Sequence, residues 1–193
     1  MPDRSTRIDE LDKEAEMNTA WQTYHRRAGA LRQVIADLDR SGSSTPPWDD
    51  ELAALFDGPD DLLVALHDLW SRRLAARVDL ALEIDEHGPE ESVALAWREV
   101  ADELSGVRRV LDQHGDNPAL QRSGRQEHRM LAVSAGLATI GDPASRSAAV
   151  GARLVARIRG ADRSAGGGSR LTERVAGLVR RVPMPIVGAR LGA

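Results

Sequence analysis

The chain has 193 residues, of which 41% are hydrophobic and 29% are charged, enough to bury the core of one domain with tails. It contains no cysteine, which excludes disulfides, thiolate catalysis and every cysteine-based metal site. Residues 1–142 carry 16 basic and 28 acidic side chains, whereas residues 143–193 carry ten arginines and two acids. We therefore expect an acidic body with a basic tail that binds an anionic partner or folds back on the body.

Apolar residues recur at steps of three and four along most of the chain, which is the spacing of amphipathic helices. The strongest stretch runs from Leu62 to Asp85 and is apolar over roughly half of its circumference, so we expect it among other helices. Glycine and proline break the pattern between helices. Further helices are expected at about 18–39, 48–56, 89–113, 118–139 and 143–158. The expected fold class is all-α, a bundle of about five to six helices with a flexible basic C-terminal tail.

The composition changes along the chain predict four parts. These are a disordered N-terminal extension at 1–16, a helical bundle domain at 17–158, a flexible linker at 159–169 and a basic amphipathic tail at 170–193. The glycine-rich sequence ADRSAGGGS is typical of a linker. In the tail, residues 171–182 have an apolar stripe surrounded by arginines.

Three helix patterns predict specific contacts. The seam of the first helix consists of Trp21, Tyr24, Ala28, Leu31, Ile35 and Leu38, and an aromatic seam at helical spacing is usually core rather than a cofactor site. The pattern of 89–113 passes through Gly106 without slipping, which predicts one helix, bent there at most. Small residues at 134–138 and 144–152 predict a closely packed helical hairpin.

Two polar residues interrupt apolar stripes and are the candidate ligand-binding residues. His67 lies between Leu63 and Trp70 on the apolar face of the central helix, and Glu127 shares a stripe with Leu131. A buried carboxylate needs a partner, which His67 or an arginine could supply. A core histidine satisfied by its neighbours, and a glutamate that reaches solvent or pairs with an arginine, are the commoner alternatives.

Arginines form the second group of candidates. Arg122, Arg125 and Arg129 form a stripe on the outer side of 118–139 that could contact a partner, as could the tail residues Arg170, Arg174, Arg180 and Arg181. The Arg-Arg pairs at 26/27, 72/73 and 108/109 could surround an anion, but acids at i,i+4 spacing favour a solvated face. Because the body is acidic, sequence-specific nucleic-acid binding is not expected.

Motifs for catalysis, metals and nucleotides are missing from the sequence. The five histidines form no H-x-x-x-H, and no phosphate-binding glycine loop occurs. No metal, no cofactor and no catalytic residue is therefore predicted, and an enzyme is not favoured. No run of ~18 apolar residues and no signal sequence occurs, so we expect a cytoplasmic protein.

Three functions remain open at this point. The first is a non-enzymatic interaction or adaptor protein whose body folds or dimerises and whose basic tail engages a protein partner. The second is a small-ligand-binding or enzymatic bundle that uses His67 and Glu127 in a core pocket, which requires a pocket between helices 62–85 and 118–139. The third is association with an anionic membrane surface through 171–182.

Overall fold

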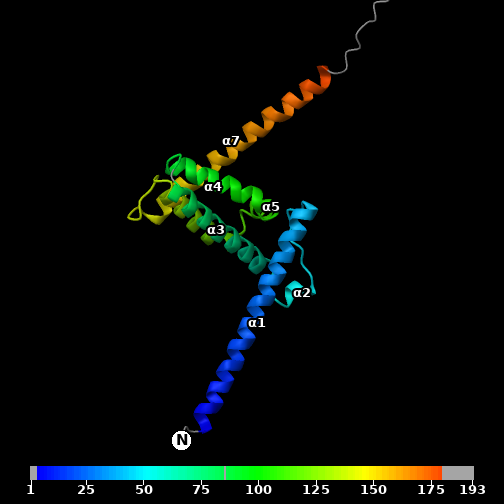
Figure 1. The fold of residues 1–193 in the computed structure, drawn as a ribbon, viewed down its shortest axis with the longest axis vertical. Coiled ribbons are helices and arrows are strands. Elements are labelled where there is room, and N and C mark those ends of the chain that lie inside the picture. The colour runs from blue at the N-terminus through cyan, green and yellow to red at the C-terminus, as the bar shows by residue number, and fades with distance from the viewer. Residues whose placement is uncertain (1–3, 85, 180–193) are drawn as a thin grey trace, which may run out of the picture.

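The computed structural model describes residues 4–84 and 86–179, with side chains described for 21–84 and 86–161. Helices are the only regular structure in this part of the chain, so the predicted all-α fold is confirmed (Figure 1). The helices are α1 (Arg4–Ser41), α2 (Asp50–Ala53), α3 (Pro59–Ile84), α4 (Pro89–Glu103), α5 (Ser105–Gln113), α6 (Pro118–Ser134) and α7 (Ala144–Val179).

The central helix α3 carries the middle of the core, as its apolar face predicts. Its fully buried side chains are Leu62, Leu66, Trp70, Leu74 and Val78. It packs against α4, α5 and α6. The ring of Trp70 meets that of Trp97 on α4 edge to face, with centroids 5.9 Å apart, a favourable arrangement for two aromatic rings.

The helix expected at 89–113 is in fact two helices, so that prediction is wrong. The break falls at Leu104, whose backbone leaves the helical region with φ −114° and ψ 43°. Close contact with α1 accounts for it. A Cβ at Gly106 would lie 2.9 Å from the backbone of Asp39, and the Asp39 carboxylate accepts a hydrogen bond from the Gly106 N–H at 2.9 Å. Asp39 thus caps the start of α5 from another helix.

Helices α6 and α7 form the closest helix pair in the body. α6 begins with the predicted cap, because the Asn117 side chain accepts from the Ala119 N–H, but it ends at Ser134, not at 139. Gly136, with φ 69°, turns the chain there. A Cβ at Gly151 would collide with the backbone carbonyl of His128. α6 and α7 therefore pack closely, as predicted from their small residues, but the close contact is between Gly151 and His128, and residues 135–138 lie beyond the end of α6.

Helix α1 meets the body only along its C-terminal part, and its N-terminal part extends away from the other helices (Figure 1). Val34 and Leu38 are buried, but Trp21 is 61% and Tyr24 is 69% exposed. The prediction that these aromatic residues are core is therefore wrong. The helices that bury Leu38 do not reach the part of α1 that carries Trp21 and Tyr24.

The short helix α2 lies within the segment 48–56, where a helix is expected, and apolar residues of this segment are buried. Asp49 caps it by accepting from the Leu52 N–H. Leu52 and Phe56 are buried, whereas Trp48 is 40% exposed.

The ends of the chain leave the predicted division into parts untested. α1 already begins at Arg4, and α7 continues through 159–169, where a linker is expected, to Val179. Residues 180–193 lie outside the described residues. Over the part of the chain that is described, no helix is both long and apolar enough to cross a membrane.

Candidate functional site

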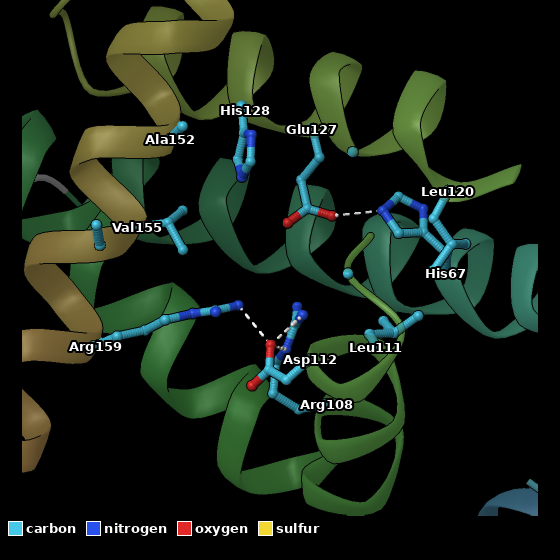
Figure 2. A pocket seen from close by; sticks show the side chains of 13 residues that line it. His67, Arg108, Leu111, Asp112, Leu120, Glu127, His128, Ala152, Val155 and Arg159 are labelled. Atoms are coloured by element: carbon cyan, nitrogen blue, oxygen red, sulfur yellow. Dashed lines mark hydrogen bonds and ion pairs between the residues drawn. The ribbon is translucent and has the colours of Figure 1, made fainter. Parts of the chain in front are cut away.

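A pocket of about 420 Å³ lies between α3, α5, α6 and α7 (Figure 2). Both candidate residues, His67 from α3 and Glu127 from α6, line it. The remaining lining residues are Arg108, Leu111, Asp112, Gly115, Leu120, Gly124, His128, Ala152, Val155, Ala156 and Arg159. The pocket that the ligand-binding hypothesis requires between the third and fifth predicted helices is therefore present.

The buried side of the pocket is an ion pair. His67 Nε2 lies 3.2 Å from Glu127 Oε2, and the two side chains are only 8% and 6% exposed. The Ser71 hydroxyl, one turn after His67, donates to Glu127 Oε2 at 3.1 Å and lies 3.3 Å from His67 Nδ1. The structure thus brings together the two residues that interrupt the apolar stripes.

The serine hydroxyl completes the hydrogen bonding of this pair. Ser71 has one proton, so when it donates to Glu127 its oxygen can only accept from His67 Nδ1. The hydroxyl thus bridges the histidine and the glutamate, and the buried carboxylate has two polar partners that offset the cost of its burial.

Glu127 is held in its charged form by its neighbours. Burial alone would raise the pKa of Glu127, but the hydrogen bond and charge of His67, followed by the charge of Arg108, outweigh burial and leave the pKa lowered. The buried indole nitrogen of Trp70 lowers this pKa further, although its geometry falls short of a hydrogen bond. The carboxylate is therefore a fixed negative charge under the pocket.

The outer side of the pocket is a second ion cluster. Asp112 Oδ1 accepts from Arg108 Nη2 at 2.6 Å and from Arg159 Nη2 at 2.7 Å, as Figure 2 shows. The Arg108 guanidinium also lies 4.8 Å from the ring of Trp70, and that of Arg159 lies 5.5 Å from Trp97. One carboxylate oxygen therefore serves two guanidiniums that rest on the paired tryptophans.

Burial and neighbouring charges lower the pKa values of two further pocket residues. Burial lowers the pKa of Arg108, and the charge of Arg159 lowers it further against the opposing effect of Asp112. Burial also lowers the pKa of His128, which points into the pocket from α6, and Arg159, Arg108 and His67 add to that effect against Glu127. His128 is thus held neutral mainly by burial, and two guanidiniums and two carboxylates face the pocket.

Ser71 is held by the buried pair and does not face the pocket. A serine nucleophile must face its substrate, but Ser71 does not line the pocket, and its proton goes to Glu127. Among the described residues, no group of three or more histidine, aspartate or glutamate side chains could hold a metal ion.

Three of the arginines predicted to bind a partner have described side chains, and these do not line the pocket. Arg122 and Arg125 are exposed on α6, and Arg129 donates to the Ile140 carbonyl at 3.3 Å. Arg170 and Arg174 belong to α7, but their side chains are outside those described, and Arg180 and Arg181 lie outside the described residues.

Three charged or titratable residues of the pocket escaped the sequence-based prediction: Asp112, His128 and Arg159. Arg108 belongs to one of the Arg-Arg pairs that could surround an anion. Its i,i+4 spacing to Asp112 favours a solvated face, but the structure places both residues in the pocket. A signal was present, because Arg108 shares a stripe with Leu104 and Leu111, and Arg159 follows Val155 at four residues.

No protein-family model, curated protein or solved structure matches this chain. The chemistry of the pocket is therefore the guide to its function.

Proposed function

We propose that this chain binds a small anionic molecule in the pocket between α3, α5, α6 and α7. The observation that carries the proposal is the pair of guanidiniums, Arg108 and Arg159, that face one pocket beside the neutral imidazole of His128. Guanidinium groups suit carboxylate and phosphate because their planar N–H groups match two oxygens at once.

The volume and apolar lining narrow the class of ligand. A volume of about 420 Å³ is in the range of small-molecule sites, at the lower end. Leu111, Leu120 and Val155 supply apolar surface beside the charged groups. The ligand that fits this surface is a small organic acid or phosphate ester with a short apolar part.

Asp112 sets how tightly such an anion binds. It already neutralises part of the charge of Arg108 and Arg159, so a ligand must bind the remaining N–H groups or displace the carboxylate. The inner carboxylate, Glu127, is held by His67 and Ser71 instead. We therefore expect the anionic group to bind on the outer side of the pocket, near His128.

The test compares two arginines of α7, one inside the pocket and one outside it. Arg159→Gln removes a pocket guanidinium, whereas the control Arg157→Gln removes one that pairs with Glu90 outside this pocket. Isothermal titration calorimetry with a panel of small carboxylates and phosphate esters should detect binding by the wild type and by Arg157→Gln, and about tenfold or weaker binding by Arg159→Gln. Equal affinities in both variants would contradict the proposal.

Native mass spectrometry of the full chain, purified gently from its own host, provides the independent measurement. A retained small mass that Arg159→Gln loses and Arg157→Gln keeps would support the proposal. A subunit that carries no small molecule, together with no binding across the panel, would contradict it.

A second proposed function, an interaction or adaptor protein, rests on the charge of residues 143–193 and on the direction of α7. α7 extends away from the body, so its residues 162–179 are directed away from the pocket (Figure 1). Deletion of 162–193 should then leave the thermal stability of the body unchanged and abolish binding to a protein partner. Binding of the full chain to anionic but not neutral vesicles, weakened by salt, would instead favour the membrane alternative.

A further inference from the structure

The seam of α1 passes from buried to exposed along one continuous face. Leu38 is 1% exposed, Leu31 and Ile35 are partly buried, and Tyr24 and Trp21 are 69% and 61% exposed. A seam with steps of three and four is the pattern of helices that pack side by side over many turns. The body covers the C-terminal half of this face and leaves the aromatic half bare.

A hollow continues the bare face toward the body. It has a volume of about 160 Å³ and lies between α1 and α3, where Tyr24, Ala28 and Leu31 meet Phe56 and Ala65. The small side chain of Ala28 keeps it open on the seam. A helix laid along the exposed part of α1 would therefore extend into this hollow.

The length of α1 also indicates a missing neighbour. The helix has 38 residues, and its N-terminal part stands apart from the other helices (Figure 1). In proteins most of the stability of a helix comes from packing of its apolar face rather than from helix propensity. Two exposed aromatic residues one turn apart, which can bury roughly 150–250 Å² each, offer that packing.

The charges along α1 favour a second α1 as the neighbour, in antiparallel orientation. The sequence of 9–16 has five acids and one lysine, whereas that of 26–33 has three arginines and no acid. Of these arginines, Arg27 pairs with Asp61 of its own body, and Arg26 and Arg32 are exposed. The midpoint between these segments is Trp21. In an antiparallel pair that crosses at Trp21, the acidic segment of each copy runs along the basic segment of the other. A parallel pair would place like charges together.

We propose that α1 forms an antiparallel helix pair with α1 of a second copy of this chain, with Trp21 and Tyr24 at its centre. This interface is independent of the anion pocket, which is lined only by α3, α5, α6, α7 and the segment between α5 and α6. The chain is thus a dimer held together through its longest helix.

The oligomeric state is tested by sedimentation equilibrium of the full chain. We expect a dimer whose dissociation constant rises with salt concentration, and rises about tenfold or more in the double variant Trp21→Ala/Tyr24→Ala. Both side chains are exposed, so circular dichroism should report an unchanged helical fold. The control Trp48→Ala, an exposed tryptophan before α2, should leave the dimer unchanged. A monomer at all concentrations, or a dimer that the double variant does not weaken, would overturn the proposal.

The orientation is tested by a distance between two copies. Because the chain has no cysteine, Gln33→Cys introduces a single spin-label site on an exposed position of α1. Residue 33 lies twelve residues from Trp21, so an antiparallel pair separates the two labels by roughly 36 Å at a rise of about 1.5 Å per residue. A parallel pair would keep them within roughly 25 Å, since paired helix axes lie about 8–10 Å apart. Double electron–electron resonance should give the longer distance, and the shorter one would overturn the antiparallel assignment.

Discussion

The two long helices, α1 and α7, both extend beyond the body, but their contacts with it differ in extent (Figure 1). α7 is fixed by shape, because Gly151 lets it approach the His128 backbone so closely that no side chain fits between them. α1 is fixed over a shorter contact near its C-terminus, where Gly106 approaches the backbone of Asp39 and the Asp39 carboxylate accepts from the Gly106 N–H. Both attachments therefore rest on close packing, but that of α7 on α6 is the more extensive.

This difference corresponds to the roles proposed for the two helices. α7 must hold Arg159 within reach of Asp112, and an ångström of movement would open that ion cluster. α1 places only Trp21 and Tyr24, which face solvent in the single chain. Substitutions near the α6–α7 pair should therefore cost more stability than substitutions where α1 is attached.

The largest effect is expected for Glu127→Ala. The substitution leaves the buried His67 without its counter-charge and Ser71 without its acceptor, so the free energy of unfolding should fall by about 3–5 kcal/mol. The control is Glu90→Ala, which breaks an exposed pair with Arg157 and should cost less than about 1 kcal/mol. Urea denaturation of both variants measures the difference, and similar costs would show that the buried pair contributes no more than a surface pair.

The next effect is expected for Gly151→Ala. The added methyl group must displace the backbone of α6 at His128, so we expect a loss of about 2–3 kcal/mol from overpacking. Gly160→Ala is the matched control on the same helix, because nothing lies within 4 Å of its Cβ position. Alanine there should be neutral or stabilise by about 0.5–1 kcal/mol. Thermal unfolding of the two variants should move in opposite directions, and a loss of stability in both would contradict packing as the cause.

A smaller effect is expected for Asp39→Ala, which tests the α1 attachment. The variant removes the side chain that caps α5 at Gly106, so we expect a loss of about 1 kcal/mol. Asp37→Ala on the same helix removes an exposed pair with Arg40 and should cost less than about 0.5 kcal/mol. Chemical denaturation separates the two. A cost at Asp39 above that of Gly151→Ala would reverse the comparison between the helices.

The sequence predicts the helices best where the signals are local. The apolar face of α3 and the Asn117 cap before Pro118 both lie within a few residues of the elements that they define. The break at Leu104 has no such signal, because its cause is the approach of Asp39 from a helix 65 residues earlier in the chain. The prediction that Trp21 and Tyr24 are core is wrong for the same reason, since periodicity shows that a face is apolar but not whether another helix covers it.

The residues of the candidate site likewise divide into those with a local sequence signal and those without one. His67 and Glu127 are recognisable because a polar residue on an apolar stripe conflicts with its surroundings. Arg108 and Asp112 form an ordinary i,i+4 pair in sequence, and only the arrival of Arg159 from α7 makes them part of a pocket. Arg159 lies just after the expected end of its helix. Its role depends on α7 continuing beyond residue 158.

The smallest expected effect is the dependence of stability on pH, which arises from two residues of α6. The pKa of Glu127 is lowered in the folded state, against burial, by His67 and Arg108. Its contribution to stability is therefore complete above the usual value of 4.5 and is lost as the pH falls through the lowered folded value. The pKa of His128 is also lowered, by burial and by nearby cations, so its protonation below 6.5 acts in the same direction. Denaturation between pH 3 and 7 should show the stability advantage of the wild type over Glu127→Gln shrinking below pH 4.5. An advantage that stays constant as the pH falls would mean that the carboxylate charge contributes nothing to the fold.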